Sequence, residues 1–62
     1  MRIELNGYGK VIGVRNWEAV PRVGDMVVMG HISDEPGITG AYPVQEVRWE
    51  PAFIKIYLKT GR

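Results

Sequence analysis

The stretch from Tyr42 to Lys59 constrains the fold of this 62-residue chain more than any other part of the sequence. Its second half alternates apolar and polar side chains, which is the period of a strand with one buried face. The apolar set consists of Ile54, Ile56 and Leu58. The turn residues Glu50–Ala52 separate this half from the first. The stretch therefore predicts two strands joined by a tight turn.

The first half of this stretch carries its apolar residues out of phase. Tyr42 and Val44 share one face of a regular strand, and Val47 and Trp49 share the opposite face. One extra residue at Gln45–Glu46, a β-bulge, brings all four side chains to the same side. A small barrel needs a sharply bent strand, so we expect the bulge here.

The first thirty residues predict three further short strands. Residues 2–15 indicate a hairpin with Asn6–Gly7 as its two-residue turn, and the alternative is a single edge strand followed by a longer loop. Gly9 and Gly13 interrupt the second arm of this hairpin, which indicates a bulge or a close backbone contact. The apolar run 26–29, flanked by glycines, predicts a short strand with both faces covered.

The segments between these strands carry little regular structure. Residues 16–20 have room for one helical turn capped by Asn16, and Pro21 would end it. Residues 31–41, rich in Gly and Pro, predict an exposed loop. No stretch sustains a helical period, and the chain predicts about five short strands in one domain, residues 1–62.

A small all-β domain must close or cover its edge strands. A partly open, SH3-like barrel is the most economical arrangement; an OB-type barrel needs a longer chain, and a three-stranded sheet with a short helix is a further alternative. A domain of this size buries only ~60% of its unfolded surface, and the chain has no cysteine to form a disulfide. We therefore expect Trp17 and Trp49 to fill the core.

Several motifs resemble those of small phage-borne proteins. The motif P-x-x-G-D-x-V occupies residues 21–27, Y-x-V-x-x-V-x-W occupies residues 42–49, and an alternating apolar strand occupies residues 54–58. The chain also resembles SH3-like barrels, in which a Gly-Asp pair often precedes a strand. The resemblance covers residues 20–60 and implies the fold class and a phage or prophage origin. It transfers no functional residue, because the activities of such proteins are mostly unknown.

The charge balance limits the kinds of partner. Eight Lys and Arg residues stand against seven Asp and Glu residues, a net charge of +1. A dedicated nucleic-acid binder usually shows a basic excess, because phosphate contacts dominate its affinity. No apolar run approaches ~20 residues, and the N-terminal residues lack the pattern of a signal peptide. We expect a cytoplasmic protein without a membrane partner.

No motif in the chain is typical of catalysis or of cofactor binding. His31 lies near Ser33, Asp34 and Glu35 in one loop, whereas a catalytic triad needs side chains that converge from separate elements. The same cluster offers three metal ligands at best, and turn capping accounts for its residues. Residues 7–10 lack the spacing and the following helix of a phosphate loop. We predict no enzyme activity, no cofactor and no metal site.

Aromatic and basic side chains supply the candidate binding surface. Phe53 and Tyr57 fall on the strand face opposite the buried isoleucines, with Lys55 between them and Arg48 and Lys59 nearby. Such side chains form protein-binding hot spots or stack on bases.

Two hypotheses for function follow from this surface. The leading one is a non-catalytic module that binds a protein partner through this face or through the 31–41 loop. The alternative is a nucleic-acid-binding barrel that uses the local basic and aromatic patch, because a near-neutral chain can still carry such a patch. Self-association also stays open, since Phe53 and Tyr57 could cover a sheet edge in a homo-oligomer.

Overall fold

The computed structural model describes residues 1–61, which form five strands and no helix. The strands are β1 (Arg2–Gly7), β2 (Lys10–Asn16), β3 (Met26–Met29), β4 (Gly40–Trp49) and β5 (Ile54–Leu58). Their order in the sheet is β2-β1-β5-β4-β3. β1 and β5 run parallel, and the other neighbouring pairs run antiparallel. Residues 1–61 thus contain no helix that could span a membrane.

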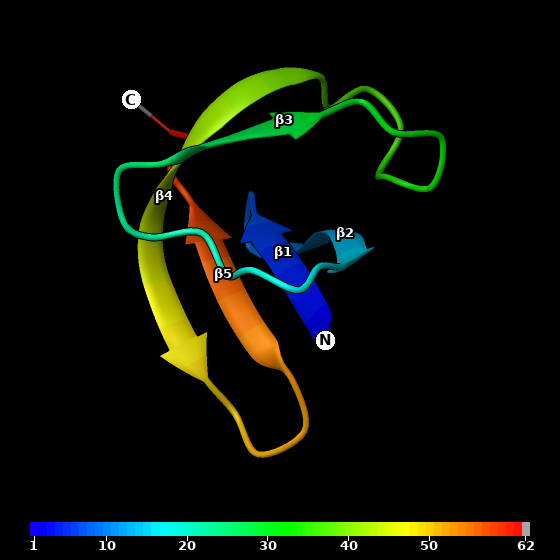
Figure 1. The fold of residues 1–62 in the computed structure, drawn as a ribbon. Coiled ribbons are helices and arrows are strands. Elements are labelled where there is room, and N and C mark those ends of the chain that lie inside the picture. Colours follow the sequence, from blue (N-terminus) through cyan, green and yellow to red (C-terminus); the bar gives the residue numbers. More distant parts are fainter. Residues whose placement is uncertain (62) are drawn as a thin grey trace.

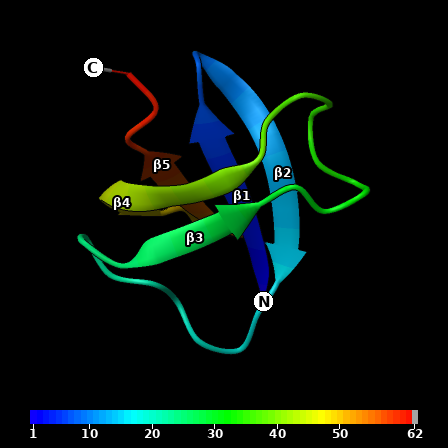
Figure 2. The same cartoon turned by 90° about the horizontal axis from the view of Figure 1, so that it is seen from above.

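The sheet curls into a half-barrel (Figure 1). Seen from above, β3 and the adjoining part of β4 cross β1 and β2 at a steep angle (Figure 2). β4 reaches both parts because it is ten residues long and strongly bent. The chain therefore has the predicted fold class, an all-β, partly open, SH3-like barrel of five short strands.

The predicted β-bulge in β4 is confirmed. Val44 lies opposite Leu58 and Glu46 lies opposite Tyr57, so Gln45 is the extra residue on β4. An extra residue on one strand bends it and increases its twist. The bulge therefore shapes the curl of the sheet.

The apolar residues on both sides of the bulge face the concave side of the half-barrel. Val47 lies opposite the buried Ile56, and Trp49 lies opposite the buried Ile54. Residues directly opposite each other on antiparallel strands share one face of the sheet. The predicted change of phase along β4 is correct.

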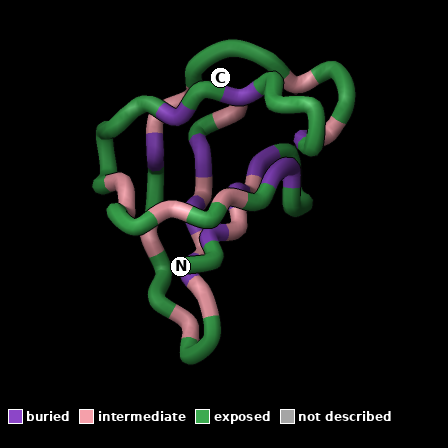
Figure 3. Tube along the Cα trace, turned by 45° about the vertical axis from the view of Figure 1, so that its right-hand side comes forward, coloured by how far each residue is buried: buried purple, intermediate pink, exposed green. Residues whose placement is uncertain are grey.

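The core consists of nine buried apolar residues contributed by all five strands. They are Ile3, Leu5, Ile12, Val27, Met29, Val44, Ile54, Ile56 and Leu58. Trp17 is partly buried against this core, but Trp49 is 66% exposed, so its assignment to the core was wrong. The β4–β5 hairpin runs past the segments that cover the concave face, and its tip carries no buried residue (Figure 3).

The first hairpin forms as predicted, but its turn lies two residues later. Tyr8 and Gly9 are the turn residues, with φ angles of 53° and 76°, and two positive φ angles are the signature of a type I′ turn. Asn6 and Gly7 instead end β1. A two-residue turn at Asn6–Gly7 would place Lys10 opposite the buried Ile3, whereas the observed register leaves Lys10 exposed and buries Ile12.

Gly13 has the predicted role, whereas Gly9 was wrongly assigned to the second strand: it is a turn residue that precedes β2. Leu5 pairs with Gly13 and Asn6 pairs with Val11, so Ile12 is an extra residue on β2. A Cβ atom on Gly13 would lie 2.6 Å from the Asp34 carboxylate. The bulge and the close contact are both present.

Two further expectations for the first half of the chain were wrong. Residues 16–20 form no helical turn: Asn16 ends β2, and residues 18–19 form a bend. The Trp17 N–H donates to the Met1 carbonyl (3.1 Å), so the chain stays paired with the start of β1 just beyond β2. β3 is covered on one face only. Val27 and Met29 face the core and are buried, whereas Val28 points to the opposite face of the strand and is 72% exposed.

The long loop between β3 and β4 bridges the open side of the half-barrel. The Glu35 N–H donates to the Ile12 carbonyl on β2 (2.8 Å). Because β2 and β3 are the two edges of the sheet, this loop covers the gap between them, as an edge strand requires. Most of the loop is exposed, as predicted, with Asp34 as the buried exception.

Candidate functional site

Three of the five residues predicted for binding form a cluster on the convex face of the sheet. Lys55 and Tyr57 alternate with the buried residues of β5 and are half-buried. Lys55 lies opposite Arg48 on β4. The guanidinium carbon of Arg48 lies 5.6 Å from the centre of the Tyr57 ring, a distance at which a cation is attracted by a ring. The structure therefore brings Arg48, Lys55 and Tyr57 together.

The other two predicted residues lie at opposite ends of β5. Phe53 precedes the strand and Lys59 follows it, so an extended chain places them about 20 Å apart. Phe53 is half-buried, and the guanidinium carbon of Arg2 lies 6.0 Å from its ring centre. Lys59 is exposed, and its backbone N–H donates to the Pro43 carbonyl (2.9 Å). Neither belongs to the central cluster.

Charges of both signs occupy the convex face. Glu46 pairs with Arg48 at 2.9 Å, and Glu4 pairs with Arg2 at 3.2 Å. The hydrogen bond that Arg48 donates to Glu46 raises the pKa of Arg48 above its ordinary value. With Lys55 opposite both Glu4 and Arg48, this part of the face holds three basic and two acidic side chains. A phosphate would therefore meet a field that is largely neutralised.

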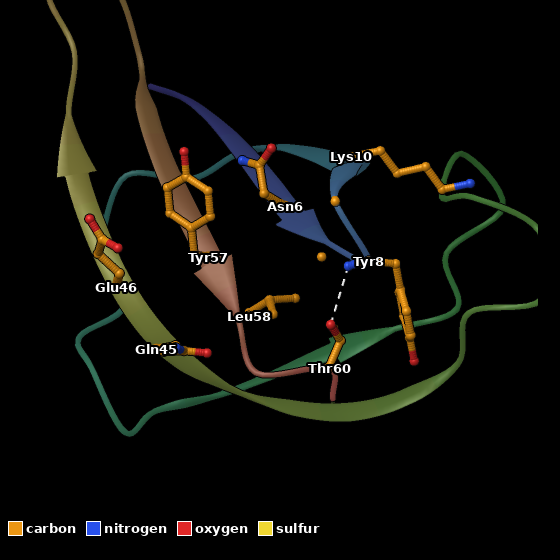
Figure 4. Close-up of a pocket in the computed structure, with 10 residues that line it drawn as sticks. Asn6, Tyr8, Lys10, Gln45, Glu46, Tyr57, Leu58 and Thr60 are labelled. Carbon is orange, nitrogen blue, oxygen red and sulfur yellow. Dashed lines mark hydrogen bonds between the residues drawn. The ribbon is translucent and has the colours of Figure 1, made fainter. Parts of the chain in front are cut away.

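A hollow of about 450 Å³ opens beside Tyr57, between the bulge of β4 and the β1–β2 turn (Figure 4). Tyr57 and Asn6 lie side by side in it, as their pairing across β5 and β1 requires. Its other lining residues come from the bulge, the turn and the end of β5: Gly7, Tyr8, Gly9, Lys10, Gln45, Glu46, Leu58 and Thr60. The central cluster thus continues into a concave surface through Tyr57.

The floor of the hollow depends on a close approach between Gly7 and Thr60. A Cβ atom on Gly7 would lie 2.7 Å from Thr60 Cγ2 and 3.0 Å from Ile12 Cδ1. The Tyr8 N–H donates to Thr60 Oγ1 (3.2 Å), which holds the residues after β5 against the turn. Position 7 therefore requires glycine because a larger side chain would meet these atoms. Its backbone conformation does not require glycine, since Tyr8 and Gly9 have positive φ angles and Gly7 does not.

Tyr8 forms the rim of the hollow on the side of the turn (Figure 4). It is 55% exposed and holds a φ angle of 53°, which is unusual for a bulky residue. Its ring packs edge-on against Tyr42 with the ring centres 6.5 Å apart, and the two hydroxyl oxygens are 3.5 Å apart. That contact raises the pKa of Tyr42.

The sequence did not identify most of this hollow. Asn6 was assigned to a turn, and Tyr8 to a strand. The predicted bulge was the one usable signal, because it turns Gln45 and Glu46 outward beside Tyr57. The position of Thr60 depends on contacts with a turn more than fifty residues earlier in the chain, which no local pattern reveals.

A buried ion pair, also missed from the sequence, ties the long loop to β2. Arg15 donates to both carboxylate oxygens of Asp34, at 2.6 and 2.8 Å. Asp34 also accepts the backbone N–H groups of Gly30 (3.1 Å) and His31 (2.9 Å). The Arg15 side chain is 13% exposed, and that of Asp34 is fully buried. The Gly13 backbone leaves the space that this carboxylate occupies.

The Arg15 hydrogen bonds are the main cause of the shifted pKa of Asp34. They lower it from 3.8 to about 2, helped by the two backbone donors and opposed by burial. The same interaction raises the pKa of Arg15. We assign this pair a structural role, because its oxygens and its guanidinium are already occupied by each other.

The residues around His31 do not form a catalytic relay. The Ser33 N–H donates to His31 Nδ1 (3.2 Å), and Ser33 Oγ lies 2.8 Å from the same nitrogen. The carboxylate of Asp34 is directed toward Arg15 and contacts the backbone of His31. Within residues 1–61, no group of three His, Cys, Asp or Glu side chains is arranged to hold a metal ion.

Comparisons with known proteins identify no relative of this chain. No protein-family model matches it, and no curated protein or solved structure is significantly similar to it.

Proposed function

We propose that this chain is a non-catalytic interaction module whose partner is a protein. The binding surface consists of the central cluster, Arg48, Lys55 and Tyr57, together with the hollow beside Tyr57. Phe53 and Lys59 mark the two ends of the face on which a partner would lie. We call this whole area the convex surface.

The observation that carries this proposal is the continuity between the Tyr57 ring and a concave, polar-edged hollow. Tyr57 offers apolar area with little rotamer freedom to lose, which is why tyrosine is enriched among hot-spot residues. Around it, Glu46, Lys10 and Gln45 supply an acceptor, a donor and an amide. A peptide segment presents backbone donors and acceptors of both kinds, and this mixture of groups suits it.

The charges favour a protein over a nucleic acid. Arg48 is engaged by Glu46 at 2.9 Å, and Lys10 lies 3.6 Å from Glu35. Nucleic-acid affinity depends on Lys and Arg side chains that are not neutralised by nearby acids. Among the described basic side chains of the convex surface, only Lys55 and Lys59 form no ion pair. We therefore treat nucleic-acid binding as an outcome of the test.

A capture experiment with matched variants tests the proposal. The chain is immobilised and incubated with a nuclease-treated bacterial lysate, so that capture through nucleic acid is removed. We expect a discrete protein to be retained by the wild type and lost in the Lys55→Ala/Tyr57→Ala variant. Val28→Thr, a change on the exposed face of β3, is the control and should retain the same protein.

The captured protein, once purified, allows a direct affinity measurement. Loss of a hot-spot aromatic typically costs ~2 kcal/mol or more, which corresponds to a roughly thirtyfold weaker Kd for the Tyr57→Ala variant. Equal recovery by the wild type and the double variant would show that the surface is wrong. Retention of labelled single-stranded DNA or RNA at low salt, with a steep loss as salt rises, would support the nucleic-acid alternative instead.

We further propose a phage origin and a cytoplasmic location. The origin is supported by the motifs at residues 21–27 and 42–49, which resemble those of phage-borne proteins. The location is supported by the absence of cysteine from the sequence, which is common in reducing compartments. The neighbouring genes test the origin, because a phage structural or host-takeover cassette would confirm it and a housekeeping operon would contradict it.

A further inference from the structure

The β4–β5 hairpin carries an exposed tryptophan, Trp49, near its tip. This side chain lies on the concave face of the sheet, the face that carries the core. Trp49 lies opposite the buried Ile54, so it faces the concave side together with the core residues. It is nevertheless 66% exposed: within residues 1–61, Met1 and residues 20–23 line hollows beside it, and the hairpin extends beyond the rest of the sheet (Figure 3). An exposed aromatic side chain on the core-facing side of a sheet is typical of a site where a binding partner buries it.

Two hollows flank Trp49 and share it as a common wall. The larger, of about 380 Å³, lies against residues 20–23 and is lined by Val20, Pro21, Val23 and Val47 besides Arg22. The smaller, of about 190 Å³, lies against the 50–53 turn and is lined by apolar residues besides Glu50. Ligand pockets start at roughly 300 Å³, so the larger hollow has room for an indole ring.

Each hollow is lined by one charged side chain, and the two have opposite signs. The smaller hollow is also lined by Met1, whose α-ammonium donates to Asn16 Oδ1 (2.7 Å). Arg22 belongs to the larger hollow and Glu50 to the smaller. In Figure 1, the segment 17–25 crosses the half-barrel on one side of the end of β4, and the 50–53 turn lies on the other side. Neither Arg22 nor Glu50 takes part in an ion pair within the described chain. The tip is therefore an apolar surface with a cation on one side of Trp49 and an anion on the other.

We propose that this tip binds a second copy of the same chain. In a two-fold arrangement the same patch serves both copies, and each residue meets the counterpart on the opposite side of the axis. With the two Trp49 side chains beside the axis, each indole enters the larger hollow of the other copy. Each Arg22 then faces the second copy's Glu50. The charge pattern is thus complementary to itself.

This self-complementarity favours a second copy of the chain over a partner that carries charge of one sign. A partner of one charge would be repelled by either Arg22 or Glu50, whereas a two-fold copy satisfies both. Tryptophan and arginine are also both enriched among the hot-spot residues at the centres of protein interfaces. This inference goes beyond the proposed binding function, because Trp49 and the central cluster lie on opposite faces of the sheet. The two surfaces share Phe53, which lines the smaller hollow.

Sedimentation of the purified chain over a wide range of concentrations tests the dimer. We expect the mass to rise with concentration from the 7.0 kDa of one chain toward twice that value. Trp49→Ala should abolish the rise. Val28→Ala, which removes another strongly exposed apolar side chain, is the matched control and should leave it unchanged.

Charge reversal distinguishes the two-fold arrangement from general apolar association. Arg22→Glu or Glu50→Arg alone places like charges opposite each other twice in the dimer, and each should weaken dimerisation by about tenfold or more. The Arg22→Glu/Glu50→Arg double variant exchanges the two charges and should restore it. A wild type that remains at 7.0 kDa at all concentrations, or a double variant as weak as the single ones, would overturn the proposal.

Fluorescence gives an independent reading of the same contact. In a Trp17→Phe background, the emission comes from Trp49 alone, since the chain has two tryptophans. Dimerisation should shift the emission to the blue as the concentration rises, because the indole leaves water. Tyr57→Ala should dimerise normally, so a failure of the binding proposal and a failure of the dimer proposal can be told apart.

Discussion

Replacing Asp34 with asparagine should destabilise the fold in a pH-dependent manner. Asparagine has nearly the shape of protonated aspartate, so Asp34→Asn removes the negative charge and leaves the volume in place. The variant leaves Arg15 with no anionic partner while its side chain is still only 13% exposed. A buried charge that loses its partner is costly.

The shifted pKa of Asp34 sets the size of the effect. A fall from 3.8 to about 2 corresponds to roughly 2–3 kcal/mol at pH 7 before solvent screening, since one pKa unit is equivalent to about 1.4 kcal/mol. Solvent lies close to every part of a small domain and screens the pair, so we expect about 1–2 kcal/mol. For a domain of this size, each kcal/mol lowers Tm by roughly 4–8 °C.

The direction of the pH dependence follows from the sign of the shift. The folded pKa of Asp34 is below its unfolded value, so the stabilisation is complete above pH 3.8 and is lost as the pH falls toward 2. Urea unfolding of the wild type and of Asp34→Asn, followed by circular dichroism, should show the full difference at pH 7. Most of that difference should be gone at pH 2.

A matched control keeps the measurement specific. Glu46→Gln removes an exposed carboxylate that also pairs with an arginine, and it should change stability by less than about 0.5 kcal/mol at either pH. A difference between the wild type and Asp34→Asn that stays constant from pH 7 to pH 2 would refute the reasoning. It would show that the loss arises from packing and not from the charge of the Arg15 pair.

Two further predictions concern the β1–β2 turn. Gly7→Ala should destabilise the domain by about 1–3 kcal/mol, because its Cβ would lie 2.7 Å from Thr60 Cγ2; Thr60→Ser removes that methyl group and should recover part of the loss in urea unfolding. Equal losses in both backgrounds would show that Thr60 is not the obstacle. Tyr8→Asn should raise stability by up to about 1 kcal/mol, because asparagine tolerates a φ angle of 53° better than tyrosine does. A decrease in Tm would show that the contact of Tyr8 with Tyr42 outweighs the backbone strain.

Local patterns predicted the parts of the fold that depend on neighbours in the sequence. The alternation around Ile54 and Ile56 identified both faces of β5, because a strand turns successive side chains to opposite sides. The change of phase between Val44 and Val47 located the bulge for the same reason. From these two observations, the bent strand, the fold class and the convex face on which Tyr57 lies were all correct.

The candidate site could be predicted only in part. The face that carries Lys55 and Tyr57 follows from alternation, but the hollow beside it requires Thr60 to meet Tyr8, at a separation of 52 residues. The pairing of Arg15 with Asp34 likewise joins a strand to a loop 19 residues later. Contacts of this kind arise when the sheet curls, and no spacing in the sequence encodes them.

The sequence by itself determined which way each side chain of β4 and β5 points, and the tertiary structure decided which of them are covered. Trp49 shows the difference most clearly. Its inward direction follows from strand geometry and the bulge, and both were predicted. Its exposure depends on where the other segments end, and the concave face remains open at the hairpin tip. Direction is a local property of the backbone, whereas burial is a property of everything that packs against it.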